Sequence, residues 1–194
     1  MVLESSTDYT DWHVPLHRGE LTLAAAHASL RAVGAEQQQV PLMVRLVENP
    51  KFKLPGITLF HGAVDLDTHD YIHIILGRGL LPADEAFTIG FTMGSTGKVS
   101  DEEARLFALV SRHLYPKSYK FRERELVIFR DALHLAMVSH CEALDQVVFT
   151  GYLAQPLAVI REQLAIDVDL LSAYYRIEQR LFPGSKASQR LLKD

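Results

Sequence analysis

Two histidines and two acidic residues near the middle of the chain have the side-chain types and the spacing of a metal site. They are His69, Asp70, His73 and Glu85. If this segment is helical, His69 and His73 share one face, and Asp70 reaches His73 at a separation of three residues. Imidazole and carboxylate groups together suit zinc, iron or manganese. The spacing therefore predicts ligand-type side chains directed at one spot.

Glu85 can join this group only if the chain reverses direction before it. A continuous helix would carry Glu85 roughly 18 Å past His73, at about 1.5 Å per residue. The segment Gly77 to Pro82 supplies the break, because its glycines suit a helix C-cap and Pro82 suits the first turn of a new helix. We therefore expect a helical hairpin that presents all four side chains to one metal ion.

The same residues also have an ordinary interpretation. A histidine pair at this spacing is more often solvated or hydrogen-bonded than bound to metal. Asp70 could pair with a nearby lysine or arginine, and Glu85 could simply interact with the positive end of the helix that starts at Pro82. The coincidence of all four residues with a suitable break favours the metal site over this alternative.

The elements that must position these residues are all predicted to be helices, in a single-domain all-α bundle of about seven. No β-alternating segment of useful length appears, and the Gly/Pro breaks separate helical patterns. An irregular N-terminal arm, residues 1–19, is expected to be anchored by Trp12, and residues 20–194 form the domain. The helices are expected over residues 20–33, 57–76, 82–91, 100–114, 121–152, 156–166 and 167–182.

Composition excludes several classes of function. Net charge is −4, and the lysines and arginines are scattered, so no basic stripe for nucleic acid is present. The single cysteine, Cys141, has no partner for an intramolecular disulfide, which is consistent with a reducing compartment. We expect its thiol to be buried in the protein. The N-terminus lacks the pattern of a signal peptide, and no run of eighteen apolar residues occurs. We expect a cytoplasmic protein that spans no membrane. The sequence does not decide whether the protein contacts a membrane surface.

At this point the residues suggest a family. The pattern His69-Asp70-x-x-His73, eleven residues and then Glu85 resembles the signature of the Coq-four family of ubiquinone (coenzyme Q) biosynthesis proteins. A second similarity, less specific, is Phe149 followed by Gln155-Pro156-Leu157-x-x-Ile160-Arg161-x-x-Leu164-x-Ile166, which looks like the closing helix of that family. The resemblance covers roughly residues 45–166.

The resemblance implies a helical protein that holds a divalent metal, usually zinc, beside an apolar channel for a polyprenyl chain. Its metal ligands would be His69, Asp70, His73 and Glu85. Its partners would be a polyprenyl lipid or prenylated quinone precursor and other ubiquinone biosynthesis proteins. Its role would be oxidative decarboxylation at ring carbon one, which replaces a carboxyl by a hydroxyl, or organisation of the biosynthetic complex.

Two other functions fit parts of the pattern. His69-Asp70 is the central dipeptide of HD-type metal-dependent phosphohydrolases, and His61 or His27 upstream and Asp131 or Asp145 downstream would then be further ligands. Alternatively, four protein ligands could close the metal site, and the protein would be a lipid-binding scaffold without turnover. The sequence leaves the identity of the metal open.

Overall fold

The computed structural model describes residues 9–34, 62, 64–100, 102–105, 107 and 121–193. This part of the chain is helical and contains no strand beyond one isolated bridge between Thr22 and Pro156. The predicted all-α class is therefore confirmed. The named elements are α1 (Leu23–Gly34), α3 (Leu66–Leu76), α4 (Pro82–Ser95), α6 (Glu123–Ser139), the 3₁₀ turns η1 (Leu144–Gln146) and η2 (Phe149–Tyr152), α7 (Leu157–Gln163), α8 (Val168–Leu181) and α9 (Lys186–Arg190).

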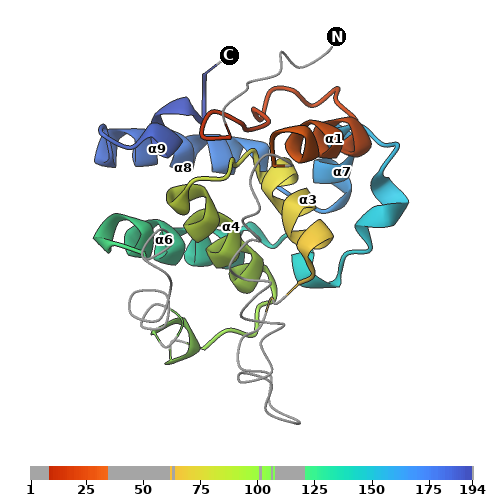
Figure 1. The fold of residues 1–194 in the computed structure, drawn as a ribbon. Helices are drawn as coiled ribbons and strands as arrows, with labels where there is room; N and C mark the ends of the chain where they lie inside the picture. The colour runs from red at the N-terminus through yellow and green to blue at the C-terminus, as the bar shows by residue number, and fades with distance from the viewer. Residues whose placement is uncertain are drawn as a thin grey trace.

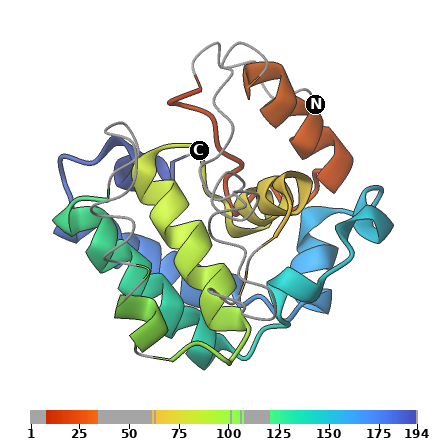
Figure 2. The same ribbon diagram turned by 60° about the horizontal axis from the view of Figure 1, so that its bottom comes forward.

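Helices α3 and α4 form the hairpin at the centre of the bundle (Figure 1). Helix α6 packs along α4, while α1 and α7 lie against α3. Helices α8 and α9 contact each other, and α9 also contacts α4 (Figure 2). The hairpin is consequently covered on several sides, which explains why its central residues are almost fully buried.

Helix α3 is shorter than the helix predicted over residues 57–76. Its first residue is Leu66, because the carboxylate of Asp65 accepts hydrogen bonds from the backbone N–H and the hydroxyl of Thr68 and so caps the helix. Asp65 therefore lies at the N-terminal end of α3 rather than inside the predicted helix. Residues 57–61 of the predicted helix lie outside the described residues.

The long helix predicted over residues 121–152 is wrong in its second half. Helix α6 ends at Ser139, and His140 adopts the left-handed conformation, with φ 56°. The chain then turns because the Glu142 N–H bonds the Leu164 carbonyl and the Leu144 N–H bonds the Ser95 hydroxyl. These contacts satisfy the backbone outside a helix, so the apolar pattern continues in 3₁₀ turns instead.

Residues 9–19, the described part of the expected N-terminal arm, form no helix and are anchored by Trp12. Trp12 is buried, and its indole N–H donates to the Ser29 hydroxyl at 3.1 Å. Cys141 is also buried, in agreement with the sequence. Among the described helices, none has the length and apolar character needed to cross a membrane.

Candidate metal centre

Three of the four predicted ligands converge on one point. His69 Nε2 and His73 Nε2 are 3.0 Å apart, Glu85 Oε2 lies 3.1 Å from His69 Nε2, and the other carboxylate oxygen, Glu85 Oε1, lies 3.4 Å from His73 Nε2. Two ligands about 2.1 Å from one ion lie about 3.0–3.4 Å apart in octahedral or tetrahedral geometry. The three separations therefore fit a metal ion, and His69, His73 and Glu85 are a group that could hold one.

The hairpin break works as the sequence predicted. Gly77 adopts the left-handed conformation, with φ 71°, and the backbone N–H groups of Gly77 and Arg78 bond the carbonyls of Ile74 and His73. Pro82 then begins α4 in its first turn. Because the reversal is tight, the first turn of α4 places Glu85 against the face of α3 that carries His69 and His73.

The three side chains are ionisable but almost fully buried, so their charges must compensate one another. The side chains of His69 and His73 are 2% and 1% exposed, and that of Glu85 is 14% exposed. Burial raises the pKa of Glu85, but the two imidazoles outweigh it and hold the pKa well below its usual range. Only one proton fits between two Nε2 atoms 3.0 Å apart, so a cation between them would satisfy both lone pairs and the carboxylate together.

The charge pattern makes the stability of metal-free protein depend on pH. Burial lowers the pKa of His73, but the Glu85 carboxylate outweighs it, so the net shift is upward from 6.5. A raised pKa contributes stability below 6.5 that is lost as pH rises through the folded-state pKa. The lowered pKa of Glu85 contributes stability above 4.5 that is lost as pH falls.

We therefore expect the advantage of chelator-treated wild type over His73→Gln to be greatest between pH 4.5 and 6.5. Thermal unfolding of both proteins across this interval and above it measures the difference. The advantage should shrink as pH rises above 6.5. If wild type without metal became more stable relative to His73→Gln as pH rises, the ion pair between His73 and Glu85 would be contradicted.

The orientation of His73 depends on a residue that the sequence did not single out. The Thr88 hydroxyl, on α4, lies 3.3 Å from His73 Nδ1. When Nε2 faces a cation, Nδ1 carries the proton and donates it to this hydroxyl, which fixes the tautomer and the ring. The spacing of Thr88 from Glu85, one turn along α4, is the only signal that could have identified it.

Thr88→Val should weaken metal binding by roughly 10- to 100-fold, as loss of such an outer partner does. Equilibrium dialysis of chelator-treated protein against Zn²⁺ measures this. Thr92→Val is the matched control, because the Thr92 hydroxyl is also buried but donates to the Thr88 carbonyl instead of a ligand. Equal losses in both variants would show that Thr88 does not act through His73.

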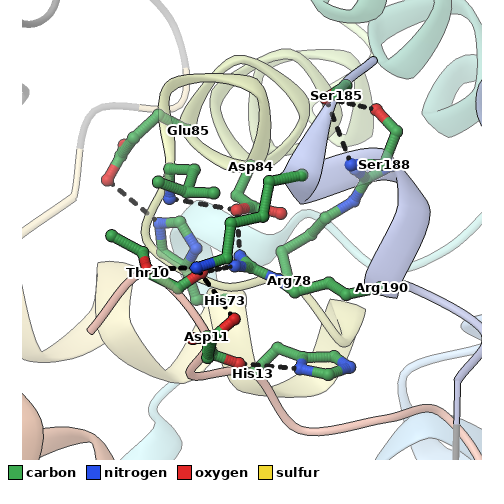
Figure 3. A network of polar contacts seen from close by, with 12 residues as sticks. Thr10, Asp11, His13, His73, Arg78, Asp84, Glu85, Ser185, Ser188 and Arg190 are labelled. Carbon is green, nitrogen blue, oxygen red and sulfur yellow. Dashed lines mark hydrogen bonds and ion pairs between the residues drawn. The ribbon is translucent and has the colours of Figure 1, made fainter. Parts of the chain in front are cut away.

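The first turn of α4, which carries Glu85, is held by a contact between Asp84 and Arg190 that the sequence analysis also missed. Asp84 accepts from the Leu81 N–H at 3.0 Å and forms a buried ion pair with Arg190, from α9 (Figure 3). Arg190 also donates to the carbonyl of Thr10 in the arm. The first turn of α4 is therefore fixed by both terminal segments of the described chain.

Asp70, the fourth predicted ligand, does not join this group. Its carboxylate faces α1 and lies 3.6 Å from His27 Nε2, and His27, Asp67 and Asp70 form a separate group of ligand-type atoms. Burial raises the pKa of Asp70, partly offset by the nearby histidines. In the structure, the hairpin thus contributes two imidazoles and one carboxylate to the group of His69, His73 and Glu85, called the first group below.

The residues named for the phosphohydrolase alternative are only partly brought together. His27 contacts Asp70, whereas Asp131 and Asp145 belong to neither group of ligand-type atoms in the described part of the chain. Asp131 instead accepts a hydrogen bond from the Tyr174 hydroxyl at 3.2 Å. His61 lies outside the described residues.

Comparison with known proteins adds no assignment: no family model, curated protein or solved structure matches the chain.

Proposed function

We propose that this protein acts in ubiquinone biosynthesis on a prenylated aromatic precursor, at a divalent metal centre held by His69, His73 and Glu85. The observation that carries the proposal is the convergence of these three side chains, 3.0–3.4 Å apart, in the hairpin that the signature requires. The substrate class and the biosynthetic partners rest on the resemblance of the signature to the Coq-four family. The residues themselves support the metal.

The composition of the group bears on the kind of chemistry. Three protein ligands leave coordination positions open, as in catalytic rather than structural metal sites. Two histidines and one carboxylate suit catalytic zinc and also non-haem iron. A bound metal would supply a Lewis acid for a substrate carboxylate or phenol oxygen, and iron would in addition exchange electrons. The chain's own residues hold the ion, orient His73 through Thr88 and exclude water by burial.

The metal identity separates catalysis from a scaffold role. Replacing a ring carboxyl by a hydroxyl is an oxidation of the substrate, and zinc does not exchange electrons. Oxidative decarboxylation by this protein would therefore require iron at the centre and an oxidant such as dioxygen. A zinc-loaded protein would fit the alternative of a lipid-binding scaffold that presents the precursor to other ubiquinone biosynthesis proteins.

Elemental analysis of purified protein tests the metal site. Wild type should retain a transition metal at this centre, and His73→Ala should lose that ion and so contain less metal per chain, whereas His134→Ala, which replaces an exposed histidine on α6, should contain as much metal as wild type. Circular dichroism establishes that each variant is folded. Metal retained without His73 but lost in Asp131→Ala would overturn the site in favour of the phosphohydrolase.

Complementation tests the pathway. Cells that lack their own Coq-four protein should regain ubiquinone when they express wild type, and should not regain it with Glu85→Gln at equal protein level. Mass spectrometry of lipids extracted from the purified protein should detect a prenylated aromatic compound. Metal-loaded wild type that restores no ubiquinone and carries no such lipid would refute the proposed pathway while leaving the metal site intact.

A further inference from the structure

A neighbouring face of α3, which is turned toward α1, also gathers ligand-type side chains. Successive residues of a helix are rotated by about 100°, so Asp70 points to a different neighbour from His69. His69 meets Glu85 on α4, whereas Asp70 meets His27 on α1. Asp67 lies three residues before Asp70 and shares its face. Helix α3 thus carries one group toward α4 and another toward α1.

The donor atoms of this second group are spaced as ligands of one ion. His27 Nε2 lies 3.6 Å from Asp70 Oδ2, and one ligand atom from each of His27, Asp67 and Asp70 falls within 4.8 Å of the others. The separation between His27 Nε2 and Asp70 Oδ2 is close to the distance of about 3.4 Å between two ligands in a tetrahedral site. It is too long for a good hydrogen bond between the two groups.

An unsatisfied buried nitrogen points independently to a ligand. His27 is 8% exposed, and its Nε2 has no hydrogen-bond partner among the described residues. Leaving such a nitrogen buried and unpaired is energetically unfavourable. The ring is held by Tyr71, whose ring centroid is 4.6 Å away, so the nitrogen stays directed at the carboxylates. A cation between them would accept the nitrogen lone pair and neutralise the two acids.

We propose that His27, Asp67 and Asp70 form a second binding site for a divalent transition-metal ion, distinct from the group of His69, His73 and Glu85. Asp67 is exposed and gives the ion a route from solvent, while His27 and Asp70 provide the buried part of the site. One imidazole and two carboxylates suit zinc, manganese or iron, with water in the remaining positions. Because Asp70 is engaged there, the first group keeps three protein ligands and its open positions.

Zinc titration of chelator-treated full-length protein, with elemental analysis after dialysis, tests this site. Wild type should bind two zinc ions per chain. His27→Ala and Asp67→Asn should each weaken one of them by at least about 100-fold, beyond the loss that an outer partner causes. His73→Ala should remove the other ion. Asp67→Asn keeps the test valid if His27→Ala, which empties a buried position, fails to fold.

Matched controls exclude nonspecific binding. His134→Ala removes an exposed histidine, and Asp169→Asn removes an exposed acid from the first turn of α8, as Asp67→Asn does in α3. Both should bind two ions. A single ion that is lost in His73→Ala and unaffected in His27→Ala and Asp67→Asn would overturn the second site and leave the proposed function standing. A single ion lost only in His27→Ala and Asp67→Asn would support this site and refute the first.

Discussion

Glu178→Gln is expected to destabilise the protein by about 3–5 kcal/mol, because it leaves the guanidinium of Arg78 buried without its counter-charge. Both side chains are 0% exposed, and they form two parallel hydrogen bonds of 3.1 and 2.6 Å. Arg78 also stacks between Phe87 and Tyr175, with its guanidinium carbon 3.7 and 4.2 Å from the ring centroids. Urea unfolding followed by circular dichroism measures the loss of free energy.

The expected loss extends to metal binding, because Arg78 directly follows Gly77 in the turn that joins α3 to α4. Zinc affinity of Glu178→Gln should therefore fall along with its stability. The double variant Arg78→Met with Glu178→Leu should recover much of the stability, since it removes both buried charges. Asp11→Asn, which breaks the exposed pair with Lys186, is the control and should change stability by less than about 1 kcal/mol. A loss in Glu178→Gln as small as in this control would contradict the role of the buried pair.

Gly94→Ala is expected to destabilise the protein by about 3 kcal/mol, the upper end of the usual cost of overpacking. A Cβ at Gly94 would clash with the carbonyl oxygen of Leu133 and lie 2.9 Å from the Cβ of Ala136, both on α6. Gly90 makes the same kind of approach to the carbonyl of Phe129. Helices α4 and α6 can therefore pack this closely only because both positions lack a side chain.

A loss of stability in Gly94→Ala would show that the clash with α6 dominates, because alanine in a helix is otherwise favoured over glycine by about 1 kcal/mol. Thermal unfolding measures both Gly94→Ala and the control Gly184→Ala. An added Cβ has no room at Gly94, whereas at Gly184 it would meet nothing within 4 Å. Gly184→Ala should be neutral within about 0.5 kcal/mol. A stabilised Gly94→Ala would mean that the two helices are farther apart than in the structure.

The sequence by itself determined the features that depend on near neighbours. The break at Gly77 and Pro82 and the helix starts at residues 100 and 167 were predicted and are confirmed, with Ser100 and Asp167 as the capping side chains. Each involves hydrogen bonds or backbone angles within a few residues, so the residue types suffice to specify them. The same local logic predicted that His69, His73 and Glu85 would meet, because a helical spacing and one reversal of the chain place them together.

Only the tertiary structure decided which helix covers which face. Helical spacing puts Asp70 near His73 along the chain, but the packing of α1 against α3 turned its carboxylate toward His27. Likewise, the end of α6 at Ser139 depends on Leu164 and Ser95, and the partner of Arg78 lies 100 residues away at Glu178. The physical reason is the same in each case: a buried polar group is satisfied by whichever partner the packed chain brings to it, and no local pattern of residues identifies that partner.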